Sequence, residues 1–345
     1  MENPKSISKS SIIERIYRSS VFGILSILIV MCVVLTLLTN KFLTVDNLLS
    51  VTRQFSFIAF MAIGECLVII TGGIDLSVGS VFAFSGVISG MAMRMWGVDP
   101  IVSMILGLIV GAAFGLLNGL FVTLLNLPPF ISTLGIMSVA RGLSYGITGG
   151  FPIPVDSPVF KTIGQGYAGP IPIPIILLVI VGVLFSLFLQ KTVIGRHIYA
   201  LGGNEEGARV SGINVKHIKR VVYSLSGLMA GLAGIATAAR LGVAQSTAGQ
   251  GYELDAIAAV IIGGASVSGG VGTVFGAILG AAIMGVLKNA LVLLSVTAYW
   301  QQTVIGCVVL LAVSMDHLRY RNAKNKRFKW RMPFELEKRK KGNLQ

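Results

Sequence analysis

Few residues of this sequence could take part in chemistry, and the most unusual are carboxyl groups in apolar surroundings. Glu65 lies within an apolar run, and Asp75 follows Gly72 and Gly73, where that run ends. An ionised Asp at the centre of a membrane costs roughly 3 kcal/mol, so each carboxyl needs a partner or a function. For Asp75 we favour capping of the next helix, near the cytoplasmic interface, over contact with a solute. For Glu65 we weigh two interpretations equally: a buried acid whose hydrogen bonds are satisfied, and a polar group that lines the pathway.

The other reactive side chains form no recognisable catalytic site. Asn118, Lys288 and Asn289 also lie within apolar runs. The histidines show no metal-ligand spacing, so we expect no metal site. The three cysteines lie in apolar runs and are interpreted as small buried hydrophobes. The sequence lacks a phosphate-binding G-x-x-x-x-G-K-[ST] loop, so we expect neither catalysis nor ATP binding by this chain.

The composition is that of a membrane protein. Of 345 residues, 54% are hydrophobic and only 12% are charged, about half the charged fraction of a soluble domain. The 42 glycines suit closely packed membrane helices. The sequence therefore predicts an all-α, polytopic integral membrane protein.

The apolar runs predict about ten transmembrane helices, with both termini in the cytoplasm. Cationic segments stay on the cytoplasmic side, and the basic segments at both ends and after the sixth span agree with an even number of spans. We expect a cytoplasmic N-terminal segment (1–19), a transmembrane domain (20–316) with a cytoplasmic loop (190–217), and a basic cytoplasmic tail (317–345) that anchors to inner-leaflet lipid rather than to nucleic acid. The predicted spans are 20–38, 54–70, 77–95, 101–125, 131–148, 172–189, 218–239, 254–268, 273–294 and 299–316.

Two features of the connections suggest moving parts. Residues 149–171 are rich in Pro and Gly and predict an ordered outward loop or a lid. Residues 69–82 share a pattern with residues 261–275, each with a Gly-Gly pair where one span ends and the next begins. Paired glycine breaks are typical of gate regions in transporters, although glycine, valine and serine also recur by chance in membrane helices.

The cytoplasmic loop contains a predicted helix of two turns. Asn204 is a favourable N-cap, Glu205 can pair with Arg209, and Gly212 can take the left-handed closing position. A helix this short is stable only when packed against something. It is either a simple connector or a docking element for a partner, and we favour docking.

Several of these segments resemble one family. Residues 71–80 (TGGIDLSVGS), Asn118-Gly119 with residues 129–135 (PFISTLG), the loop 195–213, and residues 252–258 (YELDAIA) with 263–273 are similar to permease subunits of ATP-binding-cassette importers for ribose-type monosaccharides. The resemblance runs from about residue 45 to 320. The basic tail beyond residue 320 is longer than the family leads us to expect, so its role is open.

The resemblance implies a multi-pass permease in a bacterial inner membrane, working as a pair with an identical chain or a close paralogue. Separate ATPase subunits would hold ATP and Mg, with no cofactor on this chain, and an external sugar-binding protein would deliver the solute. Neutral amides would suit hydroxyl-rich sugars. Binding-protein docking would involve Arg240, Tyr252 and Glu253. Arg240, Glu253 and Asp255 flank the outward connection after the seventh span, where they could pair with such a protein or could equally be solvated loop charges. Coupling to the ATPase would involve Gly203, Asn204, Glu205, Glu206, Ala208, Arg209, Gly212 and Ile213. The pathway or gate would involve Glu65, Gly72, Gly73, Asp75, Ser77, Asn118, Phe130, Gly263 and Gly264.

Other transporter classes remain open at this point. An ion-coupled secondary transporter would need membrane carboxyls that titrate, and Glu65 and Asp75 are the only good candidates. A related permease for nucleosides, amino acids or a sugar-derived signalling molecule is the other alternative. The small number of fixed charges in the spans argues weakly against amino acids.

Overall fold

The computed structural model describes residues 20–297 and 299–316, which are predominantly helical. The helices are α2 (Ser20–Leu38), α3 (Val45–Ile70), α4 (Val78–Arg94), α5 (Pro100–Leu124), α6 (Pro129–Thr148), α7 (Pro158–Gln165), α8 (Ile173–Lys191), α9 (Val193–Gly203), α10 (Glu205–Val210), α11 (Val215–Leu241), α12 (Tyr252–Ile262) and α13 (Val274–Leu293). Residues 299–316 form a further helix. Two antiparallel strand pairs join β1 (Ile153–Pro154) to β4 (Val243–Ala244) and β2 (Tyr167–Ala168) to β3 (Ile171–Pro172).

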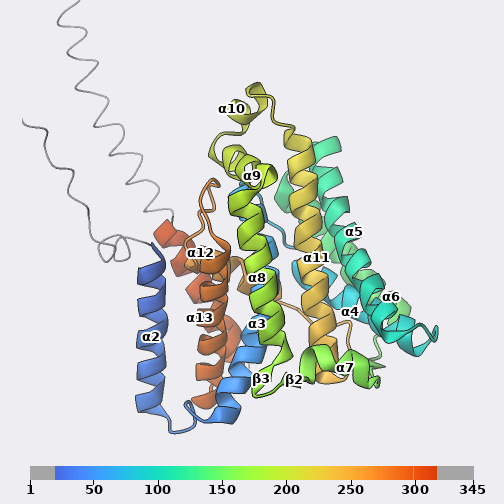
Figure 1. Cartoon of the computed structure of the whole chain (residues 1–345), viewed down its shortest axis with the longest axis vertical. Helices are drawn as coiled ribbons and strands as arrows, with labels where there is room; N and C mark the ends of the chain where they lie inside the picture. The colour runs from blue at the N-terminus through green and yellow to red at the C-terminus, as the bar shows by residue number, and fades with distance from the viewer. Residues whose placement is uncertain (1–19, 298, 317–345) are drawn as a thin grey trace, which may run out of the picture.

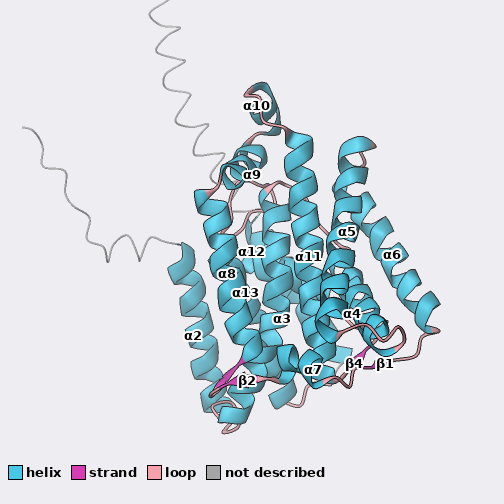
Figure 2. Cartoon of the chain, turned by 45° about the vertical axis from the view of Figure 1, so that its right-hand side comes forward, coloured by secondary structure: helices cyan, strands magenta, loops and turns pink. Residues whose placement is uncertain are grey.

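The long helices run between two ends of the molecule. Figure 1 shows α9 and α10 at one end and α7 with β2 and β3 at the other, and Figure 2 gives the same separation. We call these the α10 end and the α7 end. The predicted outward loop 149–171 lies at the α7 end as an ordered segment containing β1, α7, β2 and β3. α7 packs so closely on α11 that a β-carbon at Gly164 would meet the Ala236 carbonyl oxygen at 2.5 Å.

α3 is the centre of the helix bundle. Every residue from Ser56 to Ile70 is buried, as expected for a helix that is apolar on all sides. α11 crosses close to α5 along a row of glycines: a β-carbon on Gly111 would meet the Gly227 carbonyl oxygen at 2.5 Å, and one on Gly115 would overlap the Tyr223 backbone. Small residues therefore set the distance between these two helices.

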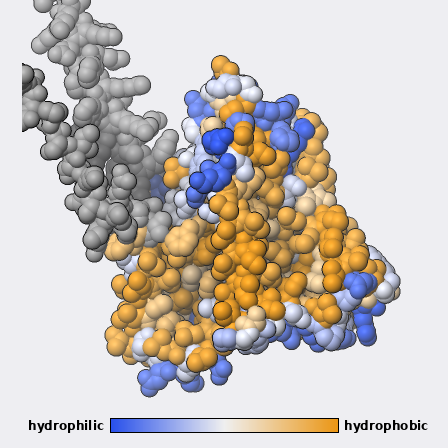
Figure 3. Space-filling model, in the orientation of Figure 1, coloured by the Kyte–Doolittle hydropathy of each residue, from blue (hydrophilic) through white to orange (hydrophobic). Residues whose placement is uncertain are grey.

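The predicted membrane character is confirmed, and the number of crossings is not fixed. Within the described part of the chain, six helices are long and apolar enough to cross a membrane: α3, α5, α6, α8, α11 and α13. Figure 3 shows a broad apolar face between two more hydrophilic ends, and α5, α6 and α8 expose many large hydrophobic side chains. All ten predicted spans contain helix, but ten crossings and the side on which the termini lie remain predictions.

Two predicted spans have different bounds in the structure. The helix expected at 54–70 begins at Val45, because residues 45–53 continue the helix in more polar sequence. The span expected at 254–268 is the 11-residue helix α12. At about 1.5 Å per residue it is roughly 16 Å long, too short to cross a hydrocarbon core of about 30 Å alone. It ends there because Gly264 takes a left-handed conformation, with φ +88°. The predicted N-terminal segment and basic tail lie outside the described residues.

Candidate functional site

The two glycine breaks predicted from the sequence have the same backbone geometry. After α3, Gly72 N–H donates to Ile69 O (2.9 Å) and Gly73 N–H to Val68 O (3.1 Å). After α12, Gly264 N–H donates to Ile261 O (2.9 Å) and Ala265 N–H to Val260 O (3.1 Å). Gly72 and Gly264 both have positive φ, +80° and +88°. The internal echo therefore corresponds to a repeated helix ending, closed each time by the pattern of a left-handed glycine cap.

The first break carries a buried polar cluster, and Asp75 is its main acceptor. Its Oδ1 accepts the backbone N–H of Ser77 at 2.9 Å and the Ser77 hydroxyl at 2.6 Å. Its Oδ2 accepts the Ser226 hydroxyl of α11 at 3.0 Å. Asn118 Nδ2 of α5 donates to Ser77 Oγ at 2.8 Å, and Asp75 N–H donates to Glu65 Oε1 at 3.1 Å. The connection from α3 to α4 is thus tied to α3, α5 and α11.

This geometry corrects part of the expectation for Asp75. Ser77, not Asp75, is the N-cap residue of α4, and it makes no side-chain cap bond. Asp75 instead bonds the N–H two residues ahead, as Asp side chains do in turns. It is completely buried and bonded to residues of α3, α5 and α11. A structural role agrees with these bonds, capping of α4 by Asp75 itself does not, and the position near the cytoplasmic interface stays a prediction.

Three atoms near the cluster lack partners. Glu65 Oε2, Asn118 Oδ1 and Tyr223 Oη are buried without a hydrogen bond among the described residues. Leaving a buried polar atom unpaired costs about 1–3 kcal/mol. The cluster therefore has unused acceptor capacity beside the first break, which suits either a bound water or a polar solute when the break opens.

Arg141 is a component that the sequence analysis missed. It lies on α6, where its Nη1 donates to the carbonyl oxygens of Ser246 (2.5 Å) and Ala248 (2.7 Å) and its Nη2 donates to Gly79 O (3.2 Å). The residue therefore holds the segment before α12 against the start of α4. The sequence signal was a single arginine inside the apolar run 131–148.

A buried ion pair is the second part of the site that the sequence did not predict. Lys288 Nζ of α13 donates to Asp255 Oδ2 of α12, and their side chains are only 14% and 2% exposed. The Lys288 ammonium also lies 4.7 Å from the centre of the Tyr252 ring. The alternative that Asp255 is a solvated loop charge is therefore wrong. The two residues belong to different helices, so neither alone revealed the pair.

The predicted helix in the loop between α8 and α11 is confirmed in detail. α10 has Asn204 as its N-cap, whose Oδ1 accepts Gly207 N–H at 2.9 Å. Glu205 pairs with Arg209 (3.4 Å) and also with Lys219 of α11 (2.9 Å). Gly212 has φ +82°. Val210 is the last residue of α10 and its side chain is exposed. Figure 3 shows an apolar tip at the α10 end.

α9, which lies within the predicted cytoplasmic loop 190–217, connects this end to both glycine breaks. Gly202 packs directly on Ile70 O, and Tyr199 Oη donates to Gly272 O at 2.8 Å. Burial raises the pKa of the Tyr199 phenol, so it stays a neutral donor. The signal for α9 was Thr192, whose hydroxyl accepts Gly195 N–H at 3.0 Å as an N-cap.

The remaining predicted residues are spread over the molecule. Phe130 is 55% exposed and lies outside the polar cluster. Gly263 packs on Gly276 O at the second break. Arg240 lies at the end of α11, with its guanidinium 5.8 Å from the Phe57 ring centre. A β-carbon on Gly79 would meet a carboxylate oxygen of Glu253, so Glu253 faces the start of α4.

Comparison with known proteins gives consistent matches. Residues 47–313 match the family described as "Branched-chain amino acid transport system / permease component". The chain is 44% identical over 292 residues to the ribose import permease protein of Bacillus subtilis (strain 168), covering 84% of this chain and 90% of that protein. It is 44% identical over 299 residues to the ribose import permease protein of Escherichia coli (strain K12), covering 86% and 92%. It is 40% identical over 278 residues to the D-allose transport system permease protein of Escherichia coli (strain K12), covering 80% and 85%. No solved structure matches the chain.

Proposed function

The chain belongs to the family of transport-system permease components matched by residues 47–313, and we propose that it forms the membrane pathway of an ATP-driven monosaccharide importer. The observation that carries this proposal is the 44% identity to ribose import permeases along nine-tenths of their length. The D-allose permease, at 40% identity, supports a sugar in general rather than one particular sugar. The protein resides in the bacterial inner membrane and is a transport component rather than an enzyme.

In the proposed topology the chain crosses the membrane ten times, with α12 and the segment 263–273 together making one crossing, and the α10 end faces the cytoplasm. The described chain begins at Ser20 and ends at Asp316, whose Oδ2 accepts Val267 N–H (3.2 Å) in the loop beside α9. In Figure 1 the upper end of α2 points toward the α10 end of the molecule. This arrangement agrees with the basic residues in the loop around α10.

The proposed partners act at opposite ends. Two ATPase subunits holding ATP and Mg would receive α10, and an external binding protein would dock at the α7 end near Arg240. A second copy of the chain, or a close paralogue, would complete the pathway. The support for the coupling role is the exposed tip of α10, held in place by the Glu205–Lys219 pair (2.9 Å).

The proposed mechanism transmits movement of α10 to both glycine breaks through α9. Gly202 of α9 touches Ile70 at the first break, and Tyr199 of α9 bonds Gly272 beyond the second. A displacement of α9 would therefore bend α3–α4 and α12–α13 together. The polar cluster around Asp75 and the Arg141 contacts would set the closed position.

The main alternatives are a permease for another small solute and an ion-coupled carrier. One experiment separates them: uptake of labelled D-ribose, D-allose, D-xylose and L-leucine into proteoliposomes containing the chain, its ATPase subunits and its binding protein. ATP-dependent uptake of one sugar supports the proposal. Uptake of leucine alone, or uptake driven by a pH gradient without ATP, contradicts it.

A further inference from the structure

A polar cavity lies between α3, α12, α13 and the helix 299–316. Its volume is about 240 Å³, equal to roughly eight waters at about 30 Å³ each. Four glutamine side chains from different parts of the chain line it: Gln54, Gln250, Gln301 and Gln302. The buried Asp255–Lys288 pair and Tyr252 form the rest of its polar wall.

The cavity contains hydrogen-bonding groups without protein partners. Asp255 is 2% exposed, and its Oδ1 has no hydrogen bond among the described residues, while its Oδ2 is taken by Lys288. The side-chain amides of Gln54 and Gln302 also make no bond within residues 20–297 and 299–316. The Gln54 and Gln302 amides line the cavity and are free to bond a solute there, whereas Asp255 Oδ1 has almost no accessible surface and is enclosed behind the ion pair.

The charge of the lining favours a neutral ligand. Asp255 and Lys288 neutralise each other, and the other polar groups of the cavity are uncharged. An anionic or cationic solute would have to break the pair, and separating a buried ion pair costs about 3–5 kcal/mol. A solute with many hydroxyls can instead exchange hydrogen bonds with the glutamine amides and leave the ion pair intact.

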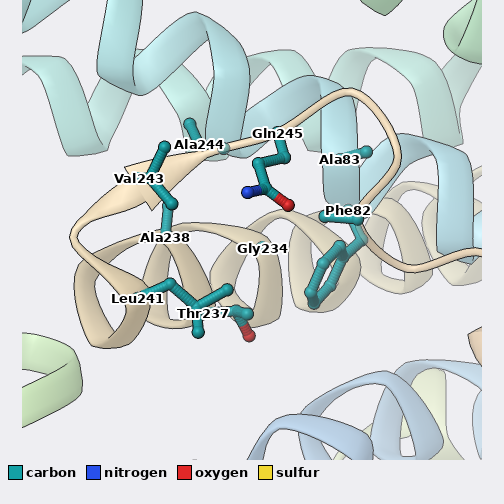
Figure 4. Close-up of a pocket in the computed structure, with 11 residues that line it drawn as sticks. Phe82, Ala83, Gly234, Thr237, Ala238, Leu241, Val243, Ala244 and Gln245 are labelled. Carbon is teal, nitrogen blue, oxygen red and sulfur yellow. The ribbon is translucent and has the colours of Figure 1, made fainter. Parts of the chain in front are cut away.

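Size and position distinguish this cavity from the pocket in Figure 4. That pocket, between Phe82, Gly234 and Thr237, has a volume of about 10 Å³, room for one water at most. The larger cavity lies on the α7 side of the second break, because Lys288 is near the end of α13 and Gly251 precedes α12. A solute arriving from the α7 end meets it before the break.

We propose that this cavity binds the neutral polyhydroxylated solute during its passage, with the amides of Gln54 and Gln302 as hydrogen-bonding contacts and the Asp255–Lys288 pair as an electrically neutral wall. The inference rests on the proposed function and adds a substrate site to it. It identifies residues that recognise a monosaccharide within the permease, separately from any external binding protein.

The test compares Gln54→Leu and Gln302→Leu with Gln190→Leu. Leucine keeps much of the side-chain volume but removes the amide, and Gln190 lies exposed on α8, bonded only to Ser186 (3.1 Å). Each variant is reconstituted with the ATPase subunits and the binding protein, and uptake of labelled D-ribose, D-allose and D-xylose is measured against concentration. Loss of one or two hydrogen bonds predicts a fall in kcat/KM of about 10-fold per cavity variant, with wild-type values for Gln190→Leu.

A second variant examines the ion pair in the cavity wall without leaving a lone buried charge. Asp255→Asn with Lys288→Gln removes both charges together, and thermal unfolding checks that the protein folds. We expect sugar uptake to fall at least 10-fold in the folded double variant. If wild-type protein transports sugar and all cavity variants match Gln190→Leu, the cavity assignment is overturned and the proposed function stands. If wild-type protein shows no ATP-dependent sugar uptake, both are overturned.

Discussion

Gly270 donates its backbone N–H to the carbonyl oxygen of Ile70 at 2.8 Å, joining the segment after the second glycine break to the end of α3. Gly202 of α9 packs against both residues of this bond. A β-carbon on Gly202 would overlap the Ile70 carbonyl oxygen and crowd Gly270 N, so no larger residue fits at Gly202 unless these backbones move. Any displacement of α9 therefore shifts the backbone at both glycine breaks.

The contact of Gly202 with Ile70 gives the first prediction. A β-carbon at Gly202 would overlap Ile70 O and lie 2.5 Å from Gly270 N, whereas one at the adjacent Gly203 would meet nothing within 4 Å. Gly202→Ala should lower the free energy of unfolding by about 1–3 kcal/mol. Thermal unfolding in detergent measures this, and Gly203→Ala should change stability by no more than about 0.5 kcal/mol. Equal stability of the two variants would contradict the packing.

The glycine row between α5 and α11 gives the second prediction. Gly115→Ala places a β-carbon against the Tyr223 backbone, while Gly142→Ala on α6 meets nothing within 4 Å. We expect Gly115→Ala to destabilise by about 1–3 kcal/mol. Gly142→Ala should be neutral or stabilising by up to about 1 kcal/mol, because alanine has the higher helix propensity. Chemical unfolding followed by circular dichroism compares the two, and a stabilising Gly115→Ala would exclude a close crossing.

The third prediction concerns the Asp75 carboxylate. Asp75→Asn replaces one acceptor oxygen by a donor, so it leaves Ser77 or Ser226 without its bond. The expected loss of stability is about 1.5–3 kcal/mol, the range for hydrogen bonds to charged groups. Asp46→Asn in the exposed first turn of α3 is the control and loses at most about 1 kcal/mol of helix-dipole stabilisation. Similar unfolding midpoints for the two variants would show that Asp75 is not held as described.

Arg141 gives the fourth prediction. The planar guanidinium of arginine can bond three carbonyl groups at once, whereas the single ammonium group of lysine cannot reach all three. In Arg141→Lys the amides of residues 245–249 should exchange with deuterium about 10-fold faster, since a loss of about 1.4 kcal/mol corresponds to a factor of 10. Arg94→Lys, at an exposed pair with Asp156 (3.6 Å), is the matched control. Unchanged exchange in Arg141→Lys would mean that the carbonyl contacts do not hold this segment.

The fifth prediction concerns coupling through α10. Gly212→Ala forces an alanine into φ +82°, a strain of roughly 1–2 kcal/mol that displaces the end of the helix. We expect the assembled transporter to keep hydrolysing ATP while moving several-fold less sugar per ATP. Gly23→Ala on α2 has free space around its β-carbon and serves as control. If Gly212→Ala transports as much sugar per ATP hydrolysed as the wild type, α10 does not take part in coupling.

Local features of this protein were the most predictable from its sequence. The cap at Asn204, the Glu205–Arg209 pair and the left-handed Gly212 all follow from residues within ten positions of each other, and the structure contains all three. The two glycine breaks were visible because they repeat. In both cases the signal and the structure it forms lie in the same stretch of chain.

Contacts between distant helices were not predictable. Ser226 lies 151 positions from Asp75 and Ser246 lies 105 from Arg141, so neither bond leaves a pattern in the sequence. The complete burial of Asp75 was not predictable for the same reason, because burial depends on which helices surround the break. The length of α12 was overestimated since apolar residues continue past Gly264, where the backbone, rather than hydropathy, ends the helix.

The most direct test of the proposed function is whether sugar accumulates against its gradient. Proteoliposomes containing the chain, its ATPase subunits and its binding protein would be supplied with ATP on the ATPase side and labelled D-ribose, D-allose or D-xylose on the other. The account predicts that one sugar reaches a higher concentration on the ATPase side, and only when ATP and both partners are present. Equilibration without accumulation, or equal flux without ATP, would contradict an ATP-driven importer.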